Sequence, residues 1–273
     1  MRPIFSATDS YNFKLAKWLE EKLKPLSVND YTINDVFCFA EEIRDIHIEE
    51  DEILASYDVT SLFSNVPLKE TIDILVEKSF SDDWFNRTYK LNLQKNQLAS
   101  LLEIATTNQL FQFNGRLYEQ RDGVAMGSLL GPLMANVFMC YLEEKLVSDG
   151  LLPTFYRRYV DDTLVIMPSV ITAENFLTTL NNLYPSLSFT MELARNDRIS
   201  FIGMEILKKG SRLKTEVYRK PTNTGLLLHF HSHVDKRYKE CLNNTMVHRA
   251  KALSSTPQGL EQECEKLRTI FNL

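Results

Sequence analysis

Apolar positions three and four residues apart predict helices along much of the chain. The clearest stretch follows Pro67, where apolar residues from Ile72 to Phe80 share one helical face and proline suits the first turn. A second such face runs from Tyr11 to Leu19. Further helices are predicted within 31–52 and over 98–105, 132–147, 172–183, 234–252 and 258–271.

Runs of β-branched and aromatic residues predict strands between these helices. Residues 53–59 form a buried strand by this criterion, and Asn114-Gly115 is the favoured two-residue turn of a hairpin. Further strands are predicted around Asp161-Asp162 within 155–167, and near 187–193, 199–207 and 212–219. Strands and helices mix without regular βαβ alternation, so the expected fold class is α+β.

Composition narrows the cellular setting. The chain has 273 residues, 44% hydrophobic and 25% charged, as is typical of a globular protein. No run approaches the roughly eighteen apolar residues of a membrane span, and the first ten residues lack the apolar centre of a signal peptide. Four cysteines lie far apart, as reduced thiols do: Cys38, Cys140, Cys241 and Cys264. We therefore expect an intracellular protein, nuclear or cytoplasmic, that is neither secreted nor membrane-bound.

Charge is unevenly distributed along the chain. The net charge of −5 argues against a nucleic-acid binder, but residues 35–58 carry a local charge of −8 and residues 205–251 a local charge of +7. The basic C-terminal segment suggests a polyanionic partner. A basic face that simply contacts solvent is the open alternative.

Asp161 and Asp162 are two adjacent acids within an apolar and aromatic stretch. A solvated turn is the usual reason for such a pair, but the apolar flanks predict a position at the edge of a core, where a divalent cation suits both carboxylates. Asp58 lies near the end of the strand predicted over 53–59. If the two strands are neighbours, Asp58 and Asp161 would face each other and form a two-metal site. A capping role for Asp58 stays open.

Five segments, in order, resemble motifs of the reverse transcriptases. "YVDD" from Tyr159 resembles the YxDD box, and "SYDVTSLFSNVP" from Ser56 the motif of the first catalytic aspartate. "GVAMGSLLGPLMANVFM" from Gly123 resembles the glycine-rich turn and helix, "ISFIGMEI" from Ile199 the primer grip, and "RPI" from Arg2 the end of the fingers motif. The wording of "DVTSLFSNVP", "AMGS", "RYVDDT" and "VYRKPTNT" is similar to that of the Penelope-like retroelements, relatives of telomerase reverse transcriptase.

This resemblance implies metal-dependent phosphoryl transfer. Asp58 and Asp161 would bind two Mg²⁺, or alternatively Mn²⁺, with Asp162 at the same site and the backbone carbonyl of Val59 assisting. A primer 3′-hydroxyl would attack the α-phosphate of a dNTP. The implied partners are an RNA or DNA template with its primer, and dNTPs.

The resemblance also implies residues that contact nucleotide and nucleic acid. Phe63 would exclude a ribose 2′-hydroxyl, although by residue type alone a core aromatic is the favoured interpretation. The residues against the nucleotide would be Arg2, Met126, Gly127 and Ser128. The primer grip would include Phe201, itself a possible core residue, and Gly203. Basic side chains would follow the phosphates of the duplex, namely Arg219, Lys220, Lys236 and Arg237.

The implied architecture is a right-hand polymerase palm, an antiparallel sheet with flanking helices, with partial fingers and the helical start of a thumb. Residues 1–210 would form fingers and palm, and residues 211–273 a thumb-like basic segment. The helices near 234–252 also resemble a DNA-reading helix-turn-helix, which we consider less fitting than a thumb. The beginning within the fingers motif, and an end without an endonuclease segment, predict a chain truncated at both ends.

The predicted function is RNA-directed DNA polymerisation. The alternative from another class is a catalytically impaired remnant that only binds nucleic acid. A palm-type polymerase that synthesises RNA is a third hypothesis, and Phe63 as a barrier to the 2′-hydroxyl argues against it.

Overall fold

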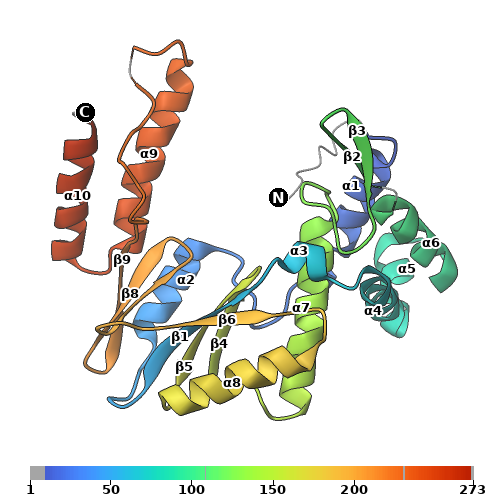
Figure 1. Cartoon of the computed structure of the whole chain (residues 1–273), viewed down its shortest axis with the longest axis horizontal. Coiled ribbons are helices and arrows are strands. Elements are labelled where there is room, and N and C mark those ends of the chain that lie inside the picture. Colours follow the sequence, from blue (N-terminus) through green and yellow to red (C-terminus); the bar gives the residue numbers. More distant parts are fainter. Residues whose placement is uncertain (1–9, 108, 230, 272–273) are drawn as a thin grey trace. The chain divides into compact units, whose positions relative to one another are not determined.

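The computed structural model describes residues 10–107, 109–229 and 231–271 (Figure 1). Arg2 lies outside the described residues. The helices are α1 (Phe13–Leu23), α2 (Val36–Glu42), α3 (Leu62–Asn65), α4 (Leu68–Phe80), α5 (Trp84–Tyr89), α6 (Lys95–Thr106), α7 (Gly131–Ser148), α8 (Val170–Leu183), α9 (Lys236–Leu253) and α10 (Pro257–Phe271). The strands are β1 (Ile53–Val59), β2 (Gln109–Phe113), β3 (Arg116–Gln120), β4 (Phe155–Tyr159), β5 (Asp162–Met167), β6 (Phe189–Leu193), β7 (Arg198–Phe201), β8 (Met204–Lys209) and β9 (Arg212–Val217).

The chain divides into two compact units, and each is described by itself. The first unit comprises the described residues up to Thr32, together with Asp58–Thr163 and Asn175–Thr190. The second comprises Ile33–Tyr57, Leu164–Glu174 and the described residues from Met191 onward. The expected boundary at residue 210 concerns polymerase subdomains and stays a prediction.

The first unit is built around a helical core. Helices α1, α4, α5, α6 and α7 contribute buried apolar side chains to one cluster, which includes Leu19, Leu75, Phe85, Leu102 and Met134. Helix α7 is apolar on nearly all sides and is correspondingly buried over most of its length.

Local sequence signals account for the ends of several elements. Pro132 lies in the first turn of α7, as predicted. The side chains of Gln94 and Gln97 form a capping box at the start of α6. The predicted hairpin is confirmed, with Asn114-Gly115 in the left-handed conformation between paired β2 and β3.

The second unit contains an antiparallel sheet in the order β7-β8-β9. The single strand predicted over 199–207 is wrong, because a turn at Ile202-Gly203 separates β7 from β8 and pairs Phe201 with Met204. In the same unit, the ring of Phe39 on α2 packs edge-on against Phe201, with centroids 5.7 Å apart. Helices α9 and α10 run side by side (Figure 1).

A four-stranded sheet has the order β4-β5-β1-β6. Strand β1 matches the predicted boundaries, and its Tyr57 hydroxyl donates a hydrogen bond to the carbonyl of Ala173, 2.8 Å away. Helices and strands mix along the chain, and the pairs β2–β3, β7–β8 and β8–β9 are antiparallel, so the predicted α+β class is confirmed.

One helix prediction needs correction, and one helix was not predicted. Tyr11 precedes α1 and is 74% exposed; the buried face of α1 consists of Ala16, Leu19 and Leu23. Helix α5 was not predicted, since it is short and both flanking residues, Asp83 and Lys90, are left-handed. Within the described residues, no helix has the length and apolar character that crossing a bilayer requires.

Candidate active site

The "YVDD" segment forms the turn of the β4–β5 hairpin. The turn residues are Val160 and Asp161, whereas Asp162 is already the first residue of β5. Of the two aspartates, only Asp161 therefore lies in the turn itself. Val160 has a φ of 56°, which is strained for a β-branched residue. Asp161 and Asp162 are both half-buried.

The end of β1 lies against this turn. The amide of Val59 donates a hydrogen bond of 3.2 Å to the carbonyl of Asp161. Asp58 is exposed, whereas its neighbours Tyr57 and Val59 are buried, as the alternation of a strand requires. The next amide, that of Thr60, donates to the carbonyl of Ser188 at 2.8 Å. Asp58 and Asp161 are thus brought to neighbouring positions by backbone contacts within the first unit.

The carboxylate oxygens of Asp58 and Asp161 are chemically suited to a divalent cation of the Mg²⁺ type. Such an ion takes oxygen ligands and is commonly held by one or two carboxylates together with substrate phosphates. Among the described residues, no cluster of three or more His, Cys, Asp or Glu side chains is arranged to hold a metal.

The segment after β1 carries Phe63 on the short helix α3. Its ring is half-buried against the core of the first unit, so it is at least partly the core aromatic that residue type alone suggests. The carbonyl of Phe63 accepts a hydrogen bond of 2.7 Å from the amide of Val124. The ring also lies beside Gly131, where a Cβ would be 3.6 Å from two of its carbons. Phe63 is thereby fixed between the glycine-rich turn and the start of α7.

The glycine-rich turn runs from Gly123 to the start of α7. Gly123 has a φ of +69°, and a Cβ there would lie 2.4 Å from the Phe63 carbonyl oxygen. The amide of Ser128 donates to the carbonyl of Ala125 at 3.0 Å, which closes the turn. Gly127 is exposed with a φ of 97°, while Met126 and Ser128 are half-buried. Two glycines therefore allow this backbone to approach Phe63 and to stay open at Gly127.

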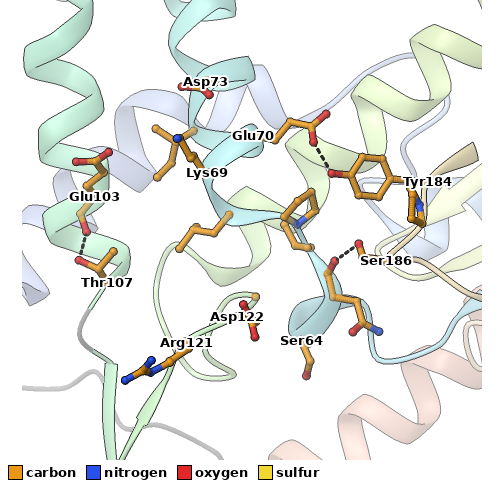
Figure 2. A pocket seen from close by; sticks show the side chains of 17 residues that line it. Ser64, Lys69, Glu70, Asp73, Glu103, Thr107, Arg121, Asp122, Tyr184 and Ser186 are labelled. Atoms are coloured by element: carbon orange, nitrogen blue, oxygen red, sulfur yellow. Dashed lines mark hydrogen bonds between the residues drawn. The ribbon is translucent and has the colours of Figure 1, made fainter.

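A pocket of about 1160 Å³ adjoins this turn within the first unit (Figure 2). Its apolar lining comes from the start of α4, and Ser64 and Gly123 complete one side. Charges of both signs surround it: Lys69 and Arg121 are basic, and Glu70, Asp73, Glu103 and Asp122 are acidic. The Tyr184 hydroxyl donates to Glu70, and this hydrogen bond raises the pKa of Tyr184 to about 12, so it remains a neutral donor. The volume of this pocket lies at the upper end of the volumes of small-molecule sites.

A buried ion pair lies beneath the hairpin, and sequence reasoning missed it. Arg158 on β4 is 0% exposed and Glu143 on α7 is 1% exposed. Burial alone would lower the pKa of Arg158, but the neighbouring Glu143 carboxylate raises it above its ordinary value. Burial, and then Glu143, hold the pKa of Tyr156 well above its usual value, so its hydroxyl stays protonated. The available signal was the alternation of β4, which turns Tyr156 and Arg158 to the same side.

The primer-grip candidates lie in the second unit. Phe201 is buried against Phe39, which matches its alternative as a core residue. Gly203 has a φ of +82°, and a Cβ there would lie 2.7 Å from Nη2 of Arg249 on α9. That Arg249 atom donates to the Gly203 carbonyl at 3.1 Å. Arg249 therefore holds this turn. From the charge of its segment alone, one would instead expect Arg249 to contact phosphate.

The basic residues predicted to contact phosphates differ in their ion pairs and in their exposure. Arg219 forms an ion pair of 2.5 Å with the buried Glu263 on α10. Lys236 pairs with Glu240 at 3.2 Å, and Arg237 pairs with Asp235 at 3.1 Å, both at the surface. Lys220 is exposed. The surface residues stay accessible to a polyanion, whereas Arg219 has an internal role.

Solved telomerase structures share this fold. The structure of telomerase from Candida albicans, in complex with a fragment of telomeric RNA, aligns with 95% of this chain and 46% of its own, with a TM-score of 0.65 and 14% identity. Apo telomerase from Candida tropicalis aligns with 98% of this chain and 50% of its own, with a TM-score of 0.55 and 12% identity. At such identities the likeness shows the fold, which is that of a polymerase, as predicted.

Sequence profiles specify the family. The profile of the family described as "Reverse transcriptase (RNA-dependent DNA polymerase)" matches residues 1–194, most of the chain. The chain therefore belongs to the reverse transcriptase family. A second profile, "Animal helix-turn-helix domain", matches residues 226–273.

A curated relative agrees with this family. Telomerase reverse transcriptase from Rattus norvegicus is 28% identical over 88 residues, which cover 32% of this chain and 8% of the rat protein. The chain spans only a small part of this relative, and about half of the Candida structures.

Proposed function

We propose that this chain polymerises DNA on a template, transferring dNMP from a dNTP to a primer 3′-hydroxyl. The observation that carries the proposal is the hydrogen bond from the Val59 amide to the Asp161 carbonyl. It brings together the two aspartates that the family motifs mark as catalytic, although they are about a hundred residues apart in a chain of the reverse transcriptase family.

The carboxylates of Asp58 and Asp161 would hold two Mg²⁺ or Mn²⁺, with Asp162 beside them and the Val59 carbonyl as a further oxygen ligand. When bound, such ions lower the pKa of the primer hydroxyl and stabilise the leaving pyrophosphate. In the transfer, the primer oxygen forms a bond to the α-phosphorus as the bond to pyrophosphate breaks. The hydrogen bond from the Val59 amide to the Asp161 carbonyl would help to keep the carboxylate of that residue in place.

Residues around the turn would select the nucleotide. The half-buried ring of Phe63 would exclude a 2′-hydroxyl, while Met126, Gly127 and Ser128 would border the nucleotide and template base. Arg2 would contact the triphosphate. The hydrogen bond from the Val124 amide to the Phe63 carbonyl supports this assignment, because it couples the glycine-rich turn to the residue that would select the sugar.

The second unit would bind the nucleic acid. The turn at Gly203, with Phe201 beneath it, would act as the primer grip. Accessible basic residues on the C-terminal segment, Lys220, Lys236 and Arg237, would contact phosphates, and α9 with α10 would begin a thumb. The wording of four motifs supports a Penelope-like retroelement as the type of origin.

A second candidate function is nucleic-acid binding without catalysis. The observation that favours it is the helix-turn-helix match over 226–273, which is independent of the polymerase motifs. In the structure, α9 and α10 are joined by the short segment Ser254–Thr256, as such motifs are.

Primer extension with Mg²⁺ on poly(rA) annealed to oligo(dT) tests the proposal. We expect wild type to extend the primer, and Asp161→Ala to lose more than about a hundredfold in rate, because even the loss of a partner outside the ligand shell costs 10–100-fold. The matched control is Asp149→Ala, which removes an exposed carboxylate at the end of α7 and should leave the rate unchanged.

Two results would contradict the proposal in different ways. If wild type binds the duplex but does not extend it, nucleic-acid binding without catalysis is the better description. If extension survives Asp161→Ala, the chain is a polymerase whose active site lies elsewhere.

A further inference from the structure

The buried ion pair beneath the hairpin is fully hydrogen-bonded. Arg158 Nε lies 2.5 Å from Glu143 Oε1, and Arg158 Nη2 lies 3.2 Å from Glu143 Oε2, so the pair is bidentate. Nη1 donates to Asn136 Oδ1 at 2.9 Å, and Nη2 contacts the Cys140 sulfur at 3.5 Å. The fifth bond runs from Nη1 to the carbonyl of Val160, at 3.1 Å. All five donors of the guanidinium are therefore used.

Glu143 is held just as firmly from its other side. It accepts hydrogen bonds from the Tyr156 hydroxyl at 3.1 Å and from the Asn29 amide at 2.6 Å. The Arg158 amide in turn donates to the Tyr31 carbonyl at 2.8 Å. Three separate segments of the first unit, the loop at 29–32, α7 and β4, thus converge on one pair of charges.

Stability is a weak explanation for such a pair. Removing two charges from water costs free energy, and well-packed apolar residues in place of a buried pair are often as stable or more so. What apolar residues cannot reproduce is the hydrogen bond to Val160. This carbonyl belongs to the peptide that joins Val160 to Asp161, and Val160 is itself strained, with a φ of 56°.

The backbone of Asp161 is consequently fixed on both sides. Arg158 binds the carbonyl of the preceding peptide, and the amide of Val59 binds the carbonyl of Asp161 itself. The Val59 amide belongs to the peptide that follows Asp58. The guanidinium of Arg158 therefore affects how Asp161 is aligned with Asp58.

We propose that Arg158, held in place by Glu143, is a positioning residue that sets the Val160–Asp161 turn against the end of β1. Its role in polymerisation rests on the proposed function; its role in the geometry does not. Arg158 acts through the backbone of Asp161 and touches no substrate in this role.

Hydrogen exchange at the Val59 amide reports the alignment directly. We compare wild type with the double variant Arg158→Met/Glu143→Met, which removes both buried charges, and with Arg158→Lys, whose single donor group cannot reach Glu143 and Val160 in the same way. We expect exchange at Val59 at least about tenfold faster in both variants, because the turn is no longer held. Exchange in α6 should stay unchanged.

A matched control removes a different ion pair, which joins α4 to α7. Lys78→Met/Glu144→Met deletes the pair next to Glu143, which lies at the surface, and should leave exchange at Val59 as in wild type. Arg158→Lys serves as the decisive variant if the double variant does not fold. Mn²⁺ titration followed by electron paramagnetic resonance should show affinity weakened about 10–100-fold by the same changes, with a lower kcat and an unchanged KM for primer–template.

The outcomes separate the two ideas. If folded variants keep Val59 protected, Arg158 is a structural residue only and the inference is overturned. If Val59 loses protection while wild type shows neither extension nor Asp161-dependent Mn²⁺ binding, the positioning role stands and the proposed function fails.

Discussion

Val160 and Ile202 both occupy the left-handed region, with φ values of 56° and 38°. β-branched residues are strained there. Each stands in the two-residue turn of a hairpin that the sequence motifs mark as functional, the YVDD hairpin and the primer-grip hairpin. Strain of this kind persists only where surrounding contacts determine the conformation, as Arg158 does at Val160 and Arg249 does near Ile202.

Gly123 is the residue at which a single methyl group should have the largest effect. In Gly123→Ala the Cβ would meet the Phe63 carbonyl oxygen at 2.4 Å and Ser64 backbone atoms at 2.5 Å, and neither can yield as a flexible side chain would. We expect the free energy of unfolding to fall by about 1–2 kcal/mol for the left-handed conformation and by about 1–3 kcal/mol more for the clash. Urea denaturation measures the sum.

Gly150→Ala is the control for that variant. Gly150 also has a left-handed φ, of +66°, but nothing lies within 4 Å of a Cβ there. It should show the conformational cost alone. Equal losses at both positions would mean that the glycine-rich turn packs less closely on Phe63 than the structure has it.

At the scale of elements, helix α9 supports the primer-grip hairpin. Arg249 binds the Gly203 carbonyl, which also accepts the amide of Tyr218 at 3.2 Å. Because the second bond remains, Arg249→Met should not leave this carbonyl unpaired. We expect a loss of about 1 kcal/mol in the free energy of unfolding, measured by urea denaturation.

The control for this prediction is Lys251→Met on the same helix, where the side chain is exposed. It should cost nothing measurable. If the two variants are equally stable, Arg249 does not hold the turn, and its guanidinium is available to bind phosphate after all.

Elements with local signals were predictable, and those without were not. The boundaries of β1, the Asn114-Gly115 turn and the first turn of α7 with its Pro132 follow from residue types in short stretches. The turn that separates β7 from β8 was missed because Ile202 is a residue that turns avoid. Its conformation is imposed by contacts distant in the sequence, and no local pattern encodes it.

At the scale of the whole molecule, the charge asymmetry has a partly internal explanation. The acidic and basic stretches belong almost entirely to the second unit. Within it, Arg44 donates to Thr215 and to the Ala252 carbonyl, and Lys208 Nζ donates to the carbonyls of Glu50 and Glu52. Some of the basic side chains therefore join the two stretches, and only the others are left to contact a polyanion.

Affinity for a template–primer duplex should depend on that remainder. We expect Lys220→Gln/Lys236→Gln to weaken binding and to reduce the slope of log affinity against log salt by about one for each phosphate that is no longer bound. Fluorescence anisotropy at several salt concentrations measures the slope. Lys17→Gln/Lys145→Gln, at exposed positions of the first unit, makes the same change in net charge. Equal slopes in the two double variants would argue against a specific basic surface.

The site was only half predictable from the sequence. Asp58 and Asp161 could be paired because Asp58 lies near the end of one strand, Asp161 follows another, and both fit ordered family motifs. Arg158 and Glu143 could not, because charged residues are expected at the surface, and the helix predicted over 132–147 contains two adjacent acids, Glu143 and Glu144. The buried member is Glu143, and only the packed structure shows which of two adjacent acids faces Arg158.

Because Val160 has a left-handed conformation, a substitution at this position that raises stability should lower activity. A library of this chain sorted only for resistance to heat would be enriched in glycine at position 160, because glycine adopts this conformation without strain. Glycine would also free the peptide before Asp161 to rotate. Heat-resistant clones recovered in this way should therefore be poor starting points for improving the proposed polymerase activity, and a useful library would leave this codon fixed.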